Sequence, residues 1–297
     1  MTLSDINHLF STDEQCRVLL AKLRWPLGKE CVRCKSKRLF ELPTQKKLEC
    51  AECGYQFTVT AGTIFHDSHL PLEKWFLAVI LICESRKGIS ANQVKRLLGV
   101  SYKTAWYLCH RIRAAMAEAE RPMLGGTVEM DETYVGGKKT GRHWMGRRDH
   151  KECVIGIRQR SGDVRFFHAQ DAKSGTLARY IQENISTDVD VIVTDDLRAY
   201  PKAMGDLKSK HETVNHTAQE YVRFGTDIHT NTVESAFSLL KRGIIGSWHK
   251  VSAKHLSAYL AEMEFRFNRR KRPDLFLETL RHMVTSDPLT FQQLTAA

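Results

Sequence analysis

TVEMDETYV, at residues 127–135, is a run in which apolar and acidic side chains alternate. Successive side chains of a β-strand point to opposite faces of its sheet. Val128 and Met130 would therefore share one face, and Glu129 and Asp131 would share the other. A carboxylate that projects from a central strand is costly unless a partner neutralises it. This stretch therefore predicts a sheet whose acidic face has a partner.

Further strand patterns follow the first one along the chain. They lie at residues 153–160, 164–169 and 189–194, and a short fifth strand is indicated near Val214. Ser161-Gly162 predicts a hairpin turn between the second and the third strand. A helical pattern covers residues 175–183, and the last long one begins near Asn231. This alternation of helices and strands predicts an α/β domain.

Two more acidic positions accompany that of the first strand. Asp195 and Asp196 end VDVIVTDD (189–196), a strand rich in β-branched residues. Glu234 lies in HTNTVESAFSLLKRG (229–243), in the first turns of a helix, and Lys241 follows two helical turns later. Acids from separate elements can hold two Mg²⁺ ions, which activate the attacking oxygen and stabilise the leaving oxygen of a phosphoryl transfer. Any one of these acids, taken singly, could equally be structural.

Four of the eight cysteines form two CxxC pairs, Cys31 with Cys34 and Cys50 with Cys53. This spacing is typical of a structural zinc site, in which each tight turn supplies two thiolates. A redox CxxC would need only one pair. The basic residues around these cysteines suit contact with phosphates, although a ribbon used only for packing remains an alternative. The remaining cysteines, at positions 16, 83, 109 and 153, lie in apolar or helical settings and are expected in the core.

The segment KGISANQVKRLLGVSYKTAWYLCHRIR (87–113) predicts two helices joined by a turn. Ser90 and Ser101 are candidate helix caps, and Gly99 suits the turn. Between Arg86 and Arg113 there are only basic charges, as expected of a surface that faces duplex DNA. The expected DNA contacts of the second helix are Tyr102, Lys103, Thr104, Tyr107 and Arg111. An ordinary helical hairpin with a solvated basic face is the alternative.

The charge of the whole chain favours an anionic partner. Its 297 residues include 45 Lys and Arg against 34 Asp and Glu, which gives a formal net charge of +11. Nucleic acid is the first candidate for such a protein. The longest apolar run, at residues 75–83, is too short to cross a bilayer, and no signal peptide is visible at the start. We therefore expect no membrane partner and a cytoplasmic, nucleoid-associated protein.

The chain resembles bacterial insertion-sequence transposases of the ISXO type, which join a zinc ribbon and a helix-turn-helix to a DDE domain. The residues that carry the resemblance are the CxxC pairs, AGTIF (61–65), VEMDETYVGGK (128–138), VTDDLRAYP (193–201) and the long block at 229–270. The resemblance implies an RNase H-like catalytic fold and a DDE triad of Asp131, Asp195 and Glu234, with Lys241 as its basic partner. Asp196 remains an alternative to Asp195, and Asn231 is a rival to Glu234 as the third metal ligand.

The resemblance also implies a division of the chain and a function. The expected parts are a helical lead-in at 1–28, a zinc ribbon at 29–62, a helix-turn-helix module at 63–122, a catalytic domain at 123–285 and a tail at 286–297. The expected activity is cleavage at the ends of the element and strand transfer, with Zn²⁺ as a structural ion and two catalytic Mg²⁺ or Mn²⁺ ions. The partners would be the double-stranded DNA of the inverted repeats and of the target, bound by a homodimer or a larger assembly. A catalytically inactive DNA-binding regulator and a metal-dependent nuclease of the same fold are the alternatives.

Basic residues outside the helical module are expected along the DNA path. They are Lys138, Lys139, Arg147 and Arg148 in the loop after the first strand, and Arg269 and Arg270 near the C-terminus.

Overall fold

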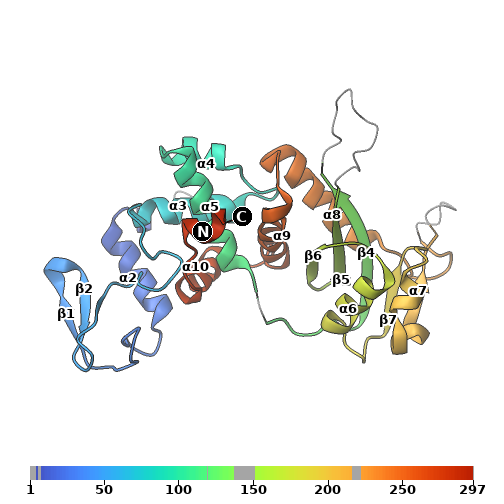
Figure 1. Cartoon of the computed structure of the whole chain (residues 1–297), viewed down its shortest axis with the longest axis horizontal. Helices are drawn as coiled ribbons and strands as arrows, with labels where there is room; N and C mark the ends of the chain where they lie inside the picture. The colour runs from blue at the N-terminus through green and yellow to red at the C-terminus, as the bar shows by residue number, and fades with distance from the viewer. Residues whose placement is uncertain (1–4, 6–7, 119, 137–150, 216–221, 297) are drawn as a thin grey trace. The chain divides into compact units, whose positions relative to one another are not determined.

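The computed structural model describes residues 5, 8–118, 120–136, 151–215 and 222–296. The chain forms two compact units, which we treat separately (Figure 1). One unit comprises Glu118–Asn268, and the other comprises Met1–Ala117 together with Arg269–Ala297. Within the described part of the chain, no helix combines the length and the apolar character that crossing a membrane requires.

The unit Glu118–Asn268 is built on a five-stranded mixed sheet with the strand order β6-β5-β4-β7-β8. The central strand β4 pairs antiparallel with β5 and parallel with β7. The strands are β4 (Thr127–Val135), β5 (Glu152–Gln159), β6 (Val164–Ala169), β7 (Val191–Thr194) and β8 (His211–Thr213). The expected α/β class is confirmed, and the expected bounds of the first and third strands are those observed.

Helices cover both faces of this sheet (Figure 1). Val128 and Met130 lie in a core with α6 (Ser174–Asn184) and α7 (Tyr200–Ala203). The opposite face, which carries Glu129 and Asp131, packs against α8 and α9. These two helices are Asn231–Gly243 and Ala253–Asn268, and a π-helical turn, Ile244–Trp248, follows the first. The alternation read from the sequence therefore separates an apolar face from the face that carries the acids.

Gly156 on β5 lets α8 approach the sheet closely. It pairs with Asp131, and a Cβ atom at this position would lie 2.6 Å from Cζ of Phe237 and 3.1 Å from Cγ2 of Val233. We expect Gly156→Ala to lower the free energy of unfolding by about 1–3 kcal/mol, because the added methyl group overpacks a filled core. Chemical denaturation measures this. Gly175→Ala is the matched control, since nothing lies within 4 Å of that position; equal losses from both variants would contradict the packing argument.

The other unit contains a small three-stranded antiparallel sheet and a group of helices. The strands are β1 (Leu39–Leu42), β2 (Lys47–Cys50) and β3 (Gln56–Phe57). The helices are α2 (Asp13–Arg24), α3 (Leu72–Glu84), α4 (Ala91–Leu98), α5 (Tyr102–Met116), α10 (Leu275–Thr285) and α11 (Phe291–Thr295). The expected caps Ser90 and Ser101 each accept a backbone hydrogen bond at 3.1 Å. The capping box of α2 uses Thr12 and Gln15.

The C-terminal segment differs from the expected division of the chain. The expected catalytic domain extends to residue 285, whereas the compact unit with the five-stranded sheet ends at Asn268, and Arg269–Ala297 makes its contacts with the N-terminal unit. Phe276 of α10 packs edge-on against Phe76 with ring centroids 5.7 Å apart, and the backbone N–H of Ile64 donates to the Met283 carbonyl. Helical periodicity shows which face of α10 is apolar, but it does not show which core buries that face.

Candidate functional site

Three carboxylates converge where β4 and β7 lie side by side. Oxygen atoms of Asp131, Glu132 and Asp195 all lie within 4.8 Å of one another. The parallel register explains this arrangement: Glu129 is opposite Val193, so two residues further along both strands Asp131 comes opposite Asp195. The structure thus brings together two acids that are 64 positions apart in the sequence (195 − 131).

Glu132 is a residue of this cluster that we did not expect. Strand alternation places its side chain on the face opposite to that of Asp131. However, the last residue of β4 that pairs with β7 is Glu129, so the edge of β4 beyond it has no strand beside it on that side. Both acids can therefore reach the same space at this edge. The adjacent pair Asp131-Glu132 was the available sequence signal.

Hydrogen bonds fix the direction of these carboxylates. The backbone N–H of Glu132 donates to Oδ1 of Asp131 at 2.8 Å, and that of Leu197 donates to Oδ1 of Asp195 at 3.1 Å. The hydroxyl of the buried Tyr200 donates to Oε2 of Glu132 at 2.9 Å. The remaining lone pairs of the three groups can serve a ligand.

The electrostatics of the cluster favour a bound cation. Burial, followed by the charges of Glu132 and Asp195, raises the pKa of Asp131 to about 7. Burial and the charge of Asp195 also raise the pKa of Glu132. Repulsion among these acids would be relieved by a divalent ion. Because the donors are all carboxylate oxygens, Mg²⁺ and Mn²⁺ fit them better than softer metals.

The other expected catalytic residues, Glu234, Asn231 and Lys241, all lie on α8. Glu234, in the first turn of α8, accepts a hydrogen bond from Thr230 at 2.8 Å, and its charge contributes to the raised pKa of Asp131. It lies outside the 4.8 Å cluster. Asn231 opens α8 and is exposed, as is Lys241 two turns further along the same helix. Asp196 is also exposed, and it is Asp195 that joins Asp131.

Glu129 holds the start of α8 against the sheet. Its fully buried carboxylate accepts hydrogen bonds from the backbone N–H groups of Thr232 and Val233, at 2.8 and 3.0 Å, and one from Arg160 at 2.9 Å. The N-cap residue of α8, Thr230, makes no side-chain cap of its own, so Glu129 satisfies N–H groups that a helix start leaves free. Its negative charge also suits a helix N-terminus. Glu129 therefore helps to place Glu234 near Asp131.

The raised pKa of Asp131 makes stability and metal binding depend on pH. An acid whose pKa is raised from 3.8 to about 7 in the folded state binds more protons there than in the unfolded chain, so its contribution to stability is lost as the pH rises through this range. We expect Mg²⁺ to raise the melting temperature more at pH 8 than at pH 5, because the metal binds the ionised carboxylate. Thermal unfolding with Mg²⁺ and with EDTA measures this. The same Mg²⁺ shift at both pH values would contradict it, and Asp131→Asn, which cannot titrate, should flatten the dependence.

The four expected zinc ligands also meet in the structure. The sulfur atoms of Cys31, Cys34, Cys50 and Cys53 all lie within 4.8 Å of one another. The Cys31–Cys53 and Cys34–Cys50 Sγ distances are 3.7 and 3.5 Å, close to the edge of about 3.8 Å that a tetrahedron with Zn–S bonds of about 2.3 Å would have. Gly54, directly after Cys53, takes a left-handed conformation with a φ of 65°, which a tight turn of this kind often needs. The residues therefore fit a tetrahedral Zn²⁺ ion.

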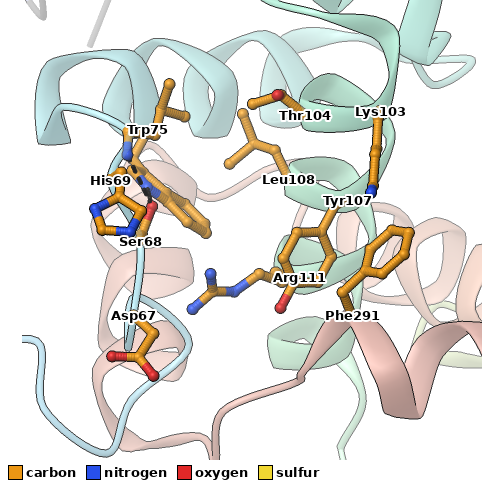
Figure 2. A pocket seen from close by; sticks show the side chains of 11 residues that line it. Asp67, Ser68, His69, Trp75, Lys103, Thr104, Tyr107, Leu108, Arg111 and Phe291 are labelled. Carbon is orange, nitrogen blue, oxygen red and sulfur yellow. Dashed lines mark hydrogen bonds between the residues drawn. The ribbon is translucent and has the colours of Figure 1, made fainter.

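The residues expected to contact DNA on α5 differ in exposure. Tyr102 is about half exposed, and Lys103 and Thr104 lie near it at the start of the helix. The Tyr107 hydroxyl donates to the Leu289 carbonyl at 2.5 Å, and Arg111 is buried. Figure 2 shows both of these side chains beside Phe291 of α11. Tyr107 is half-buried and Arg111 is buried, so both are less accessible to a duplex than Tyr102 and Lys103, and their contact with DNA stays a prediction.

The remaining basic residues are placed unevenly. Arg269 donates to Glu278 at 2.8 Å within the N-terminal unit, whereas Arg270 is exposed. Lys138, Lys139, Arg147 and Arg148 lie outside the described residues.

Comparison with known proteins identifies the family. Residues 123–268 match the ISXO2-like transposase domain, and residues 11–56 match the transposase zinc-ribbon domain. The chain is also 32% identical over 282 residues to an uncharacterized protein in transposable element ISH50 of Halobacterium salinarum, a match that covers 86% of this chain and 91% of that protein. The first match ends at residue 268, where the unit with the five-stranded sheet also ends. The chain thus belongs to the ISXO2-like transposases, with an RNase H-like mixed sheet and a zinc ribbon before it.

Proposed function

We propose that this protein catalyses DNA transposition: it binds the terminal inverted repeats of an insertion sequence, cleaves at their 3′ ends and transfers these ends into target DNA. The observation that carries the proposal is the cluster of Asp131, Glu132 and Asp195 at the edge of β4, in a domain that matches the ISXO2-like transposases.

In this proposal the carboxylates are the metal ligands. Asp131, Asp195 and Glu234 form the triad, and Glu132 is a fourth acid beside it. We prefer Glu234 to Asn231 as the ligand on α8, because the charge of Glu234 acts on Asp131. Two Mg²⁺ or Mn²⁺ ions bound here would activate the attacking oxygen and stabilise the leaving oxygen of a phosphodiester. Lys241, exposed on the same helix, would bind a DNA phosphate.

The N-terminal unit would hold the inverted repeats. The zinc ribbon and the start of α5, with the exposed Tyr102 and Lys103 and the half-buried Thr104, would supply polar and basic side chains for the duplex. Arg270 and the loop residues Lys138, Lys139, Arg147 and Arg148 would add phosphate contacts. Two element ends must be joined together, so we propose at least a dimer during the reaction, and a protein that works at the nucleoid in the cytoplasm.

A strand-transfer assay tests the proposal. The purified full chain is incubated with Mg²⁺, a linear duplex that ends in the inverted repeat of the element, and a supercoiled plasmid as target. We expect plasmid molecules joined to the 3′ ends of the duplex, and no joining when EDTA replaces Mg²⁺. A duplex with a scrambled end is the control for specificity.

Two results would overturn the proposal. Cleaved ends that are never joined would identify a metal-dependent nuclease. Binding of the inverted repeat without cleavage, at any concentration of Mg²⁺ or Mn²⁺, would identify a DNA-binding regulator.

A further inference from the structure

A cavity of about 390 Å³ lies in the N-terminal unit, between the segment at residues 67–70 and α5. Trp75, Tyr107 and Phe291 supply its aromatic surface, and Lys103 and Arg111 supply its positive charge (Figure 2). Its volume falls in the range of small-molecule sites, about 300–1,000 Å³. The cavity is formed by residues of the N-terminal unit, whereas the carboxylate cluster belongs to the other unit, and the proposed catalysis does not use the cavity.

Arg111 is the buried charge of this cavity. The residue is only 3% exposed, and its guanidinium lies 5.0 Å from the ring centre of Trp75 and 5.2 Å from that of Tyr107. Nη2 donates to the His66 carbonyl, whereas Nε is buried and has no hydrogen-bond partner among the described residues. The side chain of the nearby Asp67 is 91% exposed, so its charge is screened by water. Arg111 thus brings a largely buried positive charge to the wall of the cavity, where a ligand with acceptor atoms would meet it.

Lys103 lies at the other end of the same helix face. Lys103, Tyr107 and Arg111 are four residues apart in turn, so they form a stripe about 12 Å long on α5. The Lys103 ammonium is exposed and lies 4.4 Å from the ring centre of Phe291. The rings of Tyr107 and Phe291 meet edge to face at 5.5 Å between these two cations. A ligand that fits this arrangement has a planar ring near the buried Arg111 and an anionic group near the exposed Lys103, at the mouth of the cavity.

We propose that this cavity binds a nucleotide, with its base among Tyr107, Phe291 and Arg111 and its phosphate at Lys103. Bases stack on aromatic rings and on guanidinium planes, and guanine presents two acceptors, O6 and N7, to arginine. The nucleotide could be free or could be an unstacked nucleotide of a DNA strand. Binding of an unstacked nucleotide of a DNA strand rests on the proposed function. We favour this source because the cavity adjoins the start of α5, where we propose that the duplex is contacted.

Calorimetric titration of the full chain tests the proposal. The ligands are the four deoxynucleoside 5′-monophosphates, inorganic phosphate, and single-stranded trinucleotides with a central G or a central abasic site. We expect one saturable site, with dGMP bound most tightly and inorganic phosphate not bound. If the trinucleotide with G binds at least about tenfold more tightly than dGMP, and its abasic form does not, the source is a DNA strand; equal affinities indicate a free nucleotide.

Variants of cavity residues distinguish binding in the cavity from nonspecific attraction of the nucleotide by positive charge. Lys103→Gln and Phe291→Leu should each weaken dGMP binding about tenfold or more, and both positions are near the mouth, so these variants should fold. Arg281→Gln, which removes one exposed charge from α10 of the same unit, is the matched control. The proposal is overturned if no nucleotide binds, or if Lys103→Gln and Phe291→Leu bind dGMP as Arg281→Gln does. Strand transfer without nucleotide binding would refute the cavity assignment alone, and nucleotide binding without strand transfer would refute the proposed function alone.

Discussion

Asp131→Asn and Asp195→Asn should each reduce strand transfer at least about a thousandfold, while the protein still binds the inverted repeat. An amide keeps the shape of the side chain but removes the charge that holds a divalent ion, and each factor of ten in rate corresponds to about 1.4 kcal/mol of transition-state stabilisation. The rate is measured as joined product per unit time under single-turnover conditions. A gel-shift titration with the inverted repeat is measured in parallel, so that a loss of binding is distinguished from a loss of chemistry.

Asp131→Asn should also change the melting temperature of the metal-free protein. Burial and the neighbouring acids raise the pKa of Asp131 to about 7, so at pH 8 an ionised Asp131 is repelled by Glu132 and Asp195. Asp131→Asn should therefore raise the melting temperature of the metal-free protein at pH 8 while it abolishes strand transfer. A variant that was inactive because it was misfolded would show the opposite change in melting temperature.

Asp196→Asn is the matched control, because this acid is next to Asp195 but exposed and outside the cluster. Strand transfer that survives Asp195→Asn but is lost in Asp196→Asn would contradict our assignment of the second triad residue.

Comparison of Glu132→Gln with Glu234→Gln then ranks the remaining acids by their effect on strand transfer. Glu132 lies within the 4.8 Å cluster and Glu234 outside it, so a large loss from Glu132→Gln would show that the metal site uses four carboxylates.

The sheet and its acids show what a single sequence can predict. Alternation along residues 127–135 predicted the bounds of β4 and the faces of its side chains, because strand periodicity is a local property. The pairing of Asp131 with Asp195 was also within reach, since acids after parallel strands gather at one edge. Glu132 was missed because the same alternation rule places it on the opposite face, and only the short length of β7 opens the edge of β4 to it.

The exposed face of α5 could be predicted only in part from the sequence. The helix, its serine caps and its inward residues follow from local pattern, and the structure has them. The limited exposure of Tyr107 does not follow from the local pattern, because it depends on a contact with Leu289, which is 182 residues away. Contacts between segments that are far apart in sequence leave no periodic signal in either segment.

Removal of zinc should unfold the ribbon and leave the five-stranded sheet intact. The buried core of the ribbon consists of Cys31, Leu48, Cys50, Phe57 and Ala61, so two of its five residues are themselves metal ligands. Binding of a structural Zn²⁺ ion contributes about 10–16 kcal/mol in small zinc domains, which is more than so small an apolar core can supply. We expect the metal-bound chain to contain one zinc ion per molecule.

Cys50→Ser and treatment with a strong chelator should both release this zinc. Limited proteolysis should then cut within residues 29–60, whereas the unit with the five-stranded sheet, which has two apolar cores of its own, should stay resistant. Cys153→Ala is the matched control, because this buried cysteine of β5 lies in the other unit and should not change the zinc content.

Inverted-repeat binding should fall with the zinc content if the ribbon contacts DNA. A Cys50→Ser protein that kept its zinc and its protease resistance would show that the four thiolates do not form the metal site, and the 3.5–3.7 Å spacing of their sulfur atoms would need another cause.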